Sequence, residues 1–278
     1  MQNKKVVLIT GASSGIGKAC ADYLHESGYR VYGTSRSGAE PGQVDFDSPD
    51  SYPLLKADVN DQSSVDLLID TLLSRESKID VLLNNAGISS VGAMEDFSMD
   101  EIRTQMETNF FGAVRMIQTV LPGMRDQRSG LIINMSSIGG VMGLPFQAFY
   151  SASKFALEGV SESLRMELHE CGIRVVIIQP GNYDTPITEN RTLIKKSQKD
   201  SAYARNFENA YQVIRDEEKK GHSPLEIGQL VAKIIRTPKP KLRYMVGPLN
   251  EKMVKPYKTI FPYRLFEWLV KKYYNISS

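Results

Sequence analysis

The hydrophobic residues of this chain fall into short runs, and longer stretches with helical periodicity lie between them. Short apolar runs predict buried strands, whereas apolar positions three and four residues apart predict amphipathic helices. Strands that alternate with helices in this way are typical of a parallel sheet whose crossover helices cover both faces. We therefore predict an α/β fold with a doubly wound parallel sheet and helices on both faces.

Seven of the apolar runs are strand candidates for one wide sheet. They are Lys5–Ile9, Arg30–Thr34, Pro53–Ala57, Val81–Asn84, Gly130–Met135, Arg174–Ile178 and Arg243–Val246. Helical periodicity is clearest in five other stretches. These are Gly15–Ser27, Val65–Arg75, Met99–Val120, Phe149–Glu170 and Pro224–Ile235. The sequence therefore predicts a seven-stranded sheet in a single domain.

Two polar stretches interrupt the alternation. Ser37–Tyr52 contains glycine, proline and four acidic residues, a composition that predicts a surface loop. Residues 186–221 are charged and form a long stretch, and we predict a helical lid over a site, with a plain solvated insertion as the alternative. We expect residues 1–248 to form the α/β domain and residues 249–278 to form a C-terminal extension.

Composition limits the class of protein. The chain has 278 residues, of which 41% are hydrophobic, and a formal net charge of +2, so it can bury a full core and lacks the basic character of nucleic-acid-binding proteins. Two cysteines, Cys20 and Cys171, are too few for a disulfide framework. The histidines stand at no metal-ligand spacing, so we expect no metal site. We expect a cytoplasmic protein, because no early apolar run has the length of a secretory signal.

A glycine-rich loop follows the first predicted strand. Residues 10–17 read Thr-Gly-Ala-Ser-Ser-Gly-Ile-Gly, and a predicted helix begins inside this loop. The start of a helix offers unpaired backbone N–H groups and a partial positive charge, both suited to a pyrophosphate. Gly11 permits a tight turn, Gly15 lets the backbone approach phosphate, and Gly17 lets the helix pack near the strand. The loop predicts a Rossmann-like dinucleotide site, with a helix that merely follows a glycine turn as the alternative.

The end of the second predicted strand bears on the choice of dinucleotide. NAD-selective folds usually place an acid there to bind the ribose 2′-hydroxyl, whereas a basic residue accommodates the 2′-phosphate of NADP. Here the sequence reads Gly-Thr-Ser-Arg over residues 33–36, without an acid. The planar guanidinium of Arg36 can pair with phosphate, so we expect NADP(H), with an ordinary solvated arginine as the alternative.

Tyr150 and Lys154 stand four residues apart in a predicted helix, so their side chains share one face. A cation near a phenol favours the phenolate and moves the phenol pKa toward neutrality, where the group can act as an acid or a base. Ser137 lies 13 residues before Tyr150, at the end of a predicted strand where α/β folds gather their site residues. The three residues predict chemistry on a carbonyl or an alcohol, with Tyr150 as the acid and Ser137 holding the substrate oxygen.

The glycine loop, the serine and the Tyr-x-x-x-Lys pair together resemble the short-chain dehydrogenase/reductase family, in its branch of shorter subunits. The resemblance extends over nearly Met1 to Gly247. Asn109 falls where the family has an asparagine that positions a proton-relay water. Asp58 resembles the residue that contacts adenine, and Thr185 is placed to bind the nicotinamide carboxamide. The resemblance implies a homodimer or homotetramer. Within the family the chain resembles NADP(H)-dependent carbonyl reductases and hydroxysteroid or retinol dehydrogenases.

Motifs and resemblance together assign the expected site residues. The catalytic set is Ser137, Tyr150, Lys154 and Asn109, and by resemblance Lys154 also binds the nicotinamide ribose. The cofactor-binding set is Gly11, Ser13, Ser14, Gly15, Ile16, Gly17, Arg36, Asp58, Val59, Asn85, Ala86, Gly87, Tyr150, Lys154, Pro180, Gly181 and Thr185. Without the family resemblance, each of three residues has a structural alternative. Asn109 can be an interior polar residue, Asp58 a loop acid and Thr185 a helix cap.

Two further groups of apolar residues bear on the substrate. Around the catalytic group we predict that some of four residues form an apolar wall, with ordinary core as the alternative: Met135, Met142, Phe146 and Phe149. In the C-terminal extension one helical face carries Leu265, Phe266, Leu269, Val270 and Tyr273. From residue 239 to residue 272 there are nine basic and two acidic residues, a net charge of +7. Such a helix can lie on an anionic membrane or border the entrance for an apolar substrate. We favour a third alternative, in which it packs on its own domain or on a second subunit.

The sequence therefore predicts an NADP(H)-dependent oxidoreductase that interconverts a ketone or aldehyde and an alcohol. We expect a hydrophobic substrate of steroid, retinoid or lipid-like kind, with reduction as the direction in the cell. Two alternatives stay open, a nucleotide-sugar epimerase and a nonenzymatic NADP(H)-binding sensor or scaffold. The glycine spacing and the lack of a large C-terminal substrate domain argue against the first, and the intact catalytic group argues against the second.

Overall fold

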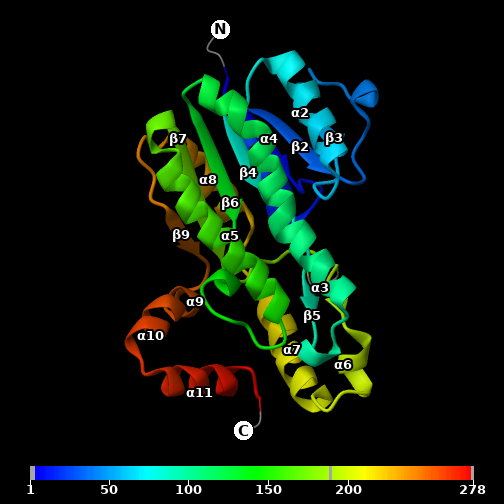
Figure 1. Cartoon of the computed structure of the whole chain (residues 1–278), viewed down its shortest axis with the longest axis vertical. Helices are drawn as coiled ribbons and strands as arrows, with labels where there is room; N and C mark the ends of the chain where they lie inside the picture. The colour runs from blue at the N-terminus through cyan, green and yellow to red at the C-terminus, as the bar shows by residue number, and fades with distance from the viewer. Residues whose placement is uncertain (1–3, 188–189, 277–278) are drawn as a thin grey trace.

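The computed structural model describes residues 4–187 and 190–276, and its centre is a sheet of seven parallel strands (Figure 1). The strands are β1 (Val6–Thr10), β2 (Arg30–Ser35), β3 (Leu54–Lys56), β4 (Val81–Asn84), β6 (Gly130–Met135), β7 (Ile173–Pro180) and β9 (Arg243–Val246). Their order across the sheet is β3-β2-β1-β4-β6-β7-β9. This confirms the predicted doubly wound sheet, and each strand lies within two residues of its predicted bounds.

The apolar runs arise because helices cover both faces of the sheet. Along β1, Val6 and Leu8 join one buried cluster, and Val7 and Ile9 join the other. Helices α2 (Gln62–Glu76) and α4 (Gly112–Asp126) contribute to the first cluster, and α1 (Gly15–Glu26) and α8 (Leu225–Arg236) contribute to the second. A strand buried on both faces needs apolar side chains at successive positions, which is why the sequence pattern is continuous.

One predicted helix is wrong in its detail. The stretch from Met99 to Val120 divides into α3 (Met99–Met106), a π-helical turn η3 (Glu107–Phe111) and α4. The last helix continues past Val120 and through Pro122, because Met124 on its final turn is fully buried in the core. A π-helical turn inserts an extra residue, which the apolar periodicity of the sequence does not reveal.

The remaining elements lie mainly beyond the carboxyl ends of the strands (Figure 1). The segment predicted to form a lid, residues 186–221 and called the lid below, contains β8 (Thr192–Leu193), α6 (Lys195–Lys199) and α7 (Ala204–Lys219), and β8 pairs with β5 (Ser90–Val91). The extension folds as α9 (Leu249–Lys252), α10 (Val254–Ile260) and α11 (Tyr263–Tyr273). Helix α5 (Ala148–Glu167) packs on the sheet. Short 3₁₀ turns are η1 (Pro41–Gln43), η2 (Met94–Asp96), η4 (Ile138–Gly140) and η5 (His169–Cys171).

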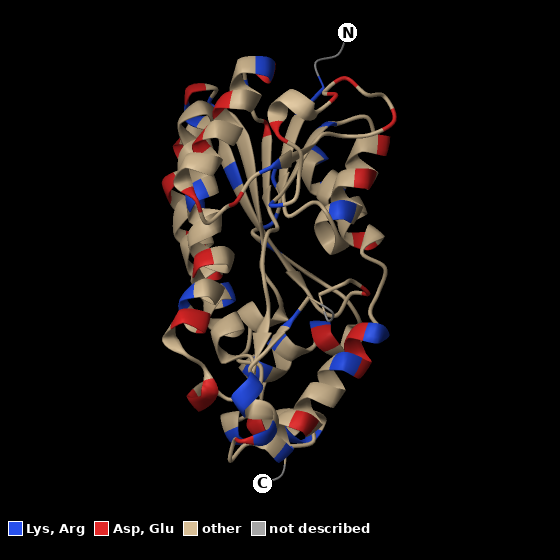
Figure 2. Cartoon of the chain, turned by 90° about the vertical axis from the view of Figure 1, so that its right-hand side faces the viewer, with Lys and Arg blue, Asp and Glu red and all other residues tan. Residues whose placement is uncertain are grey.

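Charged residues lie mainly on the outer helices and loops, whereas the strands between them carry few charges (Figure 2). Within the described part of the chain, no helix combines the length and the apolar character that a membrane crossing requires.

Candidate active site

A cavity of about 890 Å³ lies at the carboxyl ends of the strands. Its walls come from the loops after β1, β2, β3, β4, β6 and β7, together with α5, the lid and the extension. Successive strands are added in one direction from β1 to β3 and in the other direction from β4 to β9, and open α/β folds bind ligands where this order switches, between β1 and β4. Of the predicted site residues, all except Gly17 and Asn109 line the cavity. Among residues 4–187 and 190–276, no group of His, Cys, Asp and Glu side chains is placed to hold a metal ion.

The glycine loop forms the cofactor end of this cavity. Gly11 has a φ of +67°, and a Cβ on it would lie 2.9 Å from the Cα of Ala86. A Cβ on Gly17 would lie 2.2 Å from the carbonyl oxygen of Gly11, so that only glycine lets α1 begin so close to the loop. The Asn85 side-chain amide donates to the carbonyl oxygens of Thr10 and Gly11, each at 3.0 Å.

These contacts hold the loop and do not involve the backbone N–H groups at the start of α1. No acidic residue stands in the first turn of α1, so its N–H groups and positive helix dipole stay available to an anion. The residues present therefore fit the pyrophosphate of a dinucleotide. Asn85, expected among the cofactor-binding residues, is also a structural hydrogen-bonder, because its side chain holds the loop.

The adenosine end of the expected site lies beyond β2 and β3. Arg36 directly follows β2, lines the cavity and is exposed, and no described residue forms an ion pair with it. The Asp58 carboxylate accepts a hydrogen bond from the Asn60 N–H at 2.9 Å. Val59 lies against Gly112 of α4, where a Cβ would approach the valine side chain to 2.7 Å.

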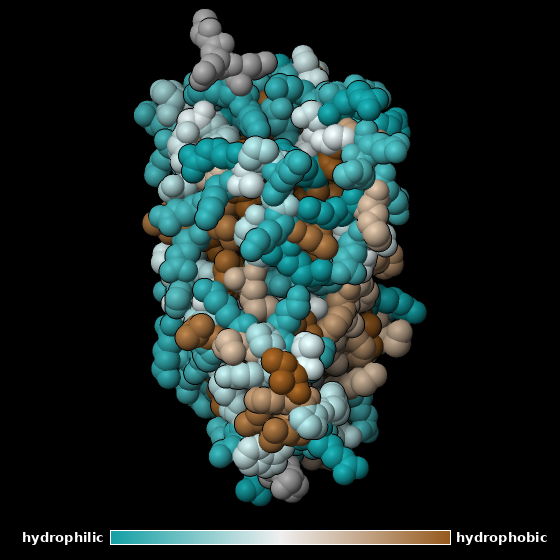
Figure 3. Space-filling view, turned by 90° about the vertical axis from the view of Figure 1, so that its left-hand side faces the viewer, coloured by the Kyte–Doolittle hydropathy of each residue, from teal (hydrophilic) through white to brown (hydrophobic). Residues whose placement is uncertain are grey.

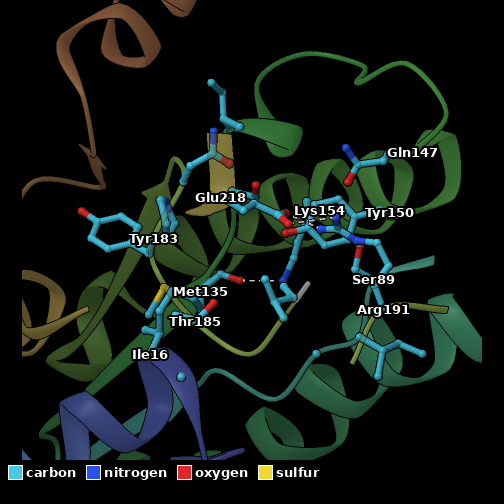
Figure 4. A pocket seen from close by; sticks show the side chains of 18 of the residues that line it. Ile16, Ser89, Met135, Gln147, Tyr150, Lys154, Tyr183, Thr185, Arg191 and Glu218 are labelled. Carbon is cyan, nitrogen blue, oxygen red and sulfur yellow. Dashed lines mark hydrogen bonds and ion pairs between the residues drawn. The ribbon is translucent and has the colours of Figure 1, made fainter. Parts of the chain in front are cut away.

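Three of the four predicted catalytic residues, Ser137, Tyr150 and Lys154, line the cavity together from the end of β6 and from α5. Figure 4 shows Tyr150 and Lys154 close to one another. The Lys154 Nζ donates to the Met135 carbonyl oxygen at 2.9 Å and lies 5.7 Å from the centre of the Tyr150 ring. The Ser137 hydroxyl oxygen accepts from the Gly139 N–H at 3.1 Å at the start of η4. A Cβ on Gly139 would lie 3.1 Å from the Tyr150 ring, so this glycine lets η4 pack against the phenol.

The electrostatics of the group differ from the sequence-based expectation. Burial raises the pKa of Tyr150 above its ordinary value, and the hydrogen bond with Ser137 opposes this rise. Burial also lowers the pKa of Lys154 to about 8. The expected shift of the phenol pKa toward neutrality is therefore wrong for this structure, because removal of water disfavours the phenolate more than the neighbouring groups stabilise it.

Asn109 lies behind the cavity wall, in the π-helical turn η3. Its Oδ1 accepts from the Ile88 N–H at 2.8 Å, and its Nδ2 donates to the Ile88 carbonyl at 3.0 Å and to the Ser153 hydroxyl at 3.1 Å. A Cβ on Gly87 would lie 3.3 Å from the Asn109 Oδ1 and 3.7 Å from the Lys154 Nζ. The bare backbone of Gly87 thus separates Asn109 from the catalytic lysine, and Asn109 holds the loop that follows β4.

The structure adds an ion pair that the sequence pattern does not reveal. Arg191 donates to both carboxylate oxygens of Glu218, at 3.1 and 2.5 Å, and to the Ser89 hydroxyl at 3.1 Å. All three residues line the cavity beside Tyr150 (Figure 4). Both charged residues belong to the polar lid, where neither spacing nor periodicity distinguishes a buried pair from solvated charges.

The apolar residues near the catalytic group have separate roles. Met135 and Met142 line the cavity as predicted. Phe146 and Phe149 instead pack against other rings, Phe207 at 5.6 Å and Phe97 at 5.0 Å between ring centres. They belong to the contacts that hold the lid and α5 in place, so two of the four residues form the predicted wall and two take the core role given as the alternative.

The predicted face of the C-terminal helix borders the cavity. Four of its five residues line it: Phe266, Leu269, Val270 and Tyr273. Leu265 is 43% exposed and lies outside this face. Of the interpretations left open by the sequence, the structure favours a helix that forms part of the cavity wall on its own subunit.

Fold and site together define a nucleotide-dependent dehydrogenase or reductase, and residues 5–196 match the family described as short chain dehydrogenase. The chain belongs to the short-chain dehydrogenase/reductase family. It is 42% identical to the 3-ketodihydrosphingosine reductase of Bacteroides thetaiotaomicron over 98% of both chains. It is 34% identical to human 17-beta-hydroxysteroid dehydrogenase type 1, covering 87% of this chain and 77% of that protein. A solved short-chain dehydrogenase from Streptomyces avermitilis superposes with a TM-score of 0.82 at 31% identity over 97% of both chains.

Proposed function

We propose that this protein reduces a ketone on a long-chain, lipid-like substrate to a secondary alcohol with NADPH, and that its substrates are 3-keto sphingoid bases. One observation carries the proposal: a single cavity joins the Tyr150, Ser137 and Lys154 group to an apolar wall from the lid and the extension. The similarity over nearly the full length to a 3-ketodihydrosphingosine reductase supports the same substrate class.

The apolar wall suits an alkyl chain. Val213 and Ile214 of α7, Val254 of α10, and Leu269 and Val270 of α11 line the cavity. Burial of each methylene group of a substrate chain contributes about 0.8 kcal/mol. A substrate with a long chain therefore gains binding free energy that a short ketone lacks.

The choice of NADPH over NADH rests on Arg36. This side chain lines the cavity at the end of β2, where an NAD-selective site usually has an acid. A guanidinium pairs with a phosphate through charge-assisted hydrogen bonds, and no described residue forms an ion pair with Arg36. The 2′-phosphate of NADPH is a matching anion.

The catalytic residues would handle the substrate oxygen and its proton. When bound, NADPH would supply the hydride for the carbonyl carbon, and the electron pair of the C=O π bond would move to the substrate oxygen. The Ser137 hydroxyl holds that oxygen, and the Tyr150 phenol donates its proton to it. Because burial raises the pKa of Tyr150, the phenol stays protonated at neutral pH, which suits reduction better than oxidation. Lys154, which lines the same cavity, would hold the nicotinamide ribose beside this group.

The test is a comparison of substrates and cofactors with the purified protein. NADPH oxidation is followed with 3-ketodihydrosphingosine, a steroid ketone and a short aliphatic ketone, and each assay is repeated with NADH. We expect the highest kcat/KM for the sphingoid ketone with NADPH, and loss of turnover in Tyr150→Phe with cofactor binding kept. A higher kcat/KM for the steroid or for the short ketone would refute the substrate class, and a preference for NADH would refute the role of Arg36.

A further inference from the structure

The outer face of the last two helices is both apolar and basic. We call it the basic aromatic surface, defined by Ile260, Tyr263, Arg264, Trp268, Lys271 and Lys272, all of which are exposed. Ile260 is 73%, Tyr263 72% and Trp268 54% exposed. In the space-filling view brown, pale and teal residues lie side by side in the lower part of the molecule, where Figure 1 places the extension (Figure 3).

These apolar side chains are not needed to fill the cavity wall. The opposite face of α11 supplies that wall through residues such as Phe266 and Val270, and Phe266 is buried. Trp268, one helical turn from Arg264 and Lys272, points away from that face. Exposed aromatic residues that serve no internal packing mark an interaction surface.

The extension is positively charged. Residues 249–278 contain six basic and two acidic residues, a net charge of +4, although the whole chain has only +2, so the rest of the protein is net negative. The Lys272 Nζ lies 5.2 Å from the centre of the Trp268 ring, and Glu267 pairs with Lys271 at 2.7 Å. Among the described residues no acidic side chain pairs with Arg264 or Lys272, so these two positive charges on the basic aromatic surface would complement an anionic partner.

We propose that the basic aromatic surface docks on an anionic lipid membrane, with the protein lying on the surface and not crossing it. Tryptophan and tyrosine side chains favour the interface between lipid and water, and each lysine or arginine near an anionic membrane contributes about 1 kcal/mol. A symmetric contact between two copies would place Arg264, Lys271 and Lys272 near their own counterparts, where like charges repel. An anionic lipid surface meets both the charge and the aromatic side chains.

Docking in this way would bring the cavity to the membrane. The same helix that carries Trp268 on its outer side lines the cavity with Leu269 and Val270. A lipid-like substrate could then pass from the bilayer along α11 to the catalytic group. This consequence rests on the proposed function, whereas the docking itself does not.

The single tryptophan of the chain, Trp268, makes the proposal directly measurable. Its fluorescence is recorded while the full chain is mixed with phosphatidylcholine vesicles that contain or lack phosphatidylglycerol, and binding is confirmed by sedimentation. We expect a blue shift and co-sedimentation only with the anionic vesicles, both reversed by high salt. The readout is binding and not turnover, so it is independent of the proposed function.

Paired charge variants separate this surface from general electrostatics. Lys271→Glu/Lys272→Glu should weaken binding to anionic vesicles at least about tenfold. The matched control is Lys4→Glu/Lys5→Glu, an exposed lysine pair at the other end of the molecule, and it should change binding little (Figure 1). Unchanged melting temperatures verify that both variants fold.

Four results would overturn the proposal. The first is a Trp268 spectrum that anionic vesicles leave unchanged, and the second is equal weakening by the two lysine pairs. The third is a blue shift that grows with protein concentration in the absence of vesicles, because that would assign the surface to a second copy of the chain. Binding to neutral vesicles as tight as to anionic ones would remove the electrostatic part of the argument and likewise overturn it.

Discussion

Arg191 and Glu218 form a buried ion pair beside Tyr150, although they lie at opposite ends of the lid. Their charges act on the phenol in opposite directions, since Arg191 lowers the pKa of Tyr150 and Glu218 raises it. Because Arg191 also donates to Ser89, the pair ties the lid to the loop that precedes β5. The pair therefore couples the position of the lid to the environment of the catalytic phenol.

Replacement of Arg191 by methionine should destabilise the protein strongly. The change leaves the buried Glu218 carboxylate without its guanidinium, and loss of one partner of a buried pair destabilises by about 3–5 kcal/mol. Urea unfolding of wild type and Arg191→Met measures the difference. The double variant Arg191→Met/Glu218→Leu is the control and should recover most of the loss, because neither charge stays buried. A single variant as stable as wild type would show that the pair does not act as described.

Replacement of Arg36 by aspartate should change the cofactor preference. A charge-assisted hydrogen bond to the 2′-phosphate contributes about 1.5–3 kcal/mol, so the Kd for NADP⁺ should rise roughly 10- to 100-fold or more. The Kd for NAD⁺ should stay constant or fall, because a carboxylate can accept from the ribose 2′-hydroxyl. Calorimetric titration with both cofactors measures the two values. The proposed role of Arg36 fails if the variant binds NADP⁺ as wild type does.

The stability contributed by Lys154 should depend on pH in a defined direction. Burial lowers its pKa from 10.5 to about 8, so between these values the unfolded chain binds more protons than the folded one. The free energy of unfolding therefore increases with pH through this window, and below it the buried charge destabilises the fold. Relative to Lys154→Met, wild type should gain about 2 kcal/mol between pH 8 and pH 10. Urea unfolding of both proteins at several pH values tests this, and a constant or falling difference would contradict it.

The inner face of α11 should determine the response to chain length. Val270→Ser should raise the KM for a long-chain ketone several-fold, because the apolar wall loses area against the alkyl chain. The KM for a short ketone should stay within about twofold, since a short chain does not reach α11. The matched control is Leu265→Ser, an exposed position of the same helix outside the lining face. Equal effects on both ketones would place the alkyl chain elsewhere.

The sequence predicted the sheet well because buried parallel strands need unbroken apolar runs. It also located Ser137, Tyr150, Lys154 and the glycine loop, whose residue types are imposed by local backbone geometry and chemistry. It missed Arg191 and Glu218, because their pairing depends on how the lid folds back over the cavity. Two-residue strands such as β5 and β8 carry no periodicity and were missed for a similar reason.

The direction of the Tyr150 pKa shift could not be derived from spacing either. Tyr150 and Lys154 share a helix face, but the shift depends on how far each group is removed from water, which the complete fold decides. The division of α3 and α4 at η3 likewise has no apolar signature, although it positions Asn109. Sequence patterns thus identify which residues meet, and tertiary burial sets their energetics.

The wall supplied by α11 also has a consequence for the order of biosynthesis. All seven strands of the sheet, up to Val246, leave the ribosome before Tyr263–Tyr273 do. A nascent chain can therefore complete its sheet and its glycine loop while the apolar side of the cavity still faces water. Premature termination within α11 would yield a folded protein whose cavity is open and whose apolar lining is exposed to water. Cellular quality control recognises exposed apolar surface of this kind.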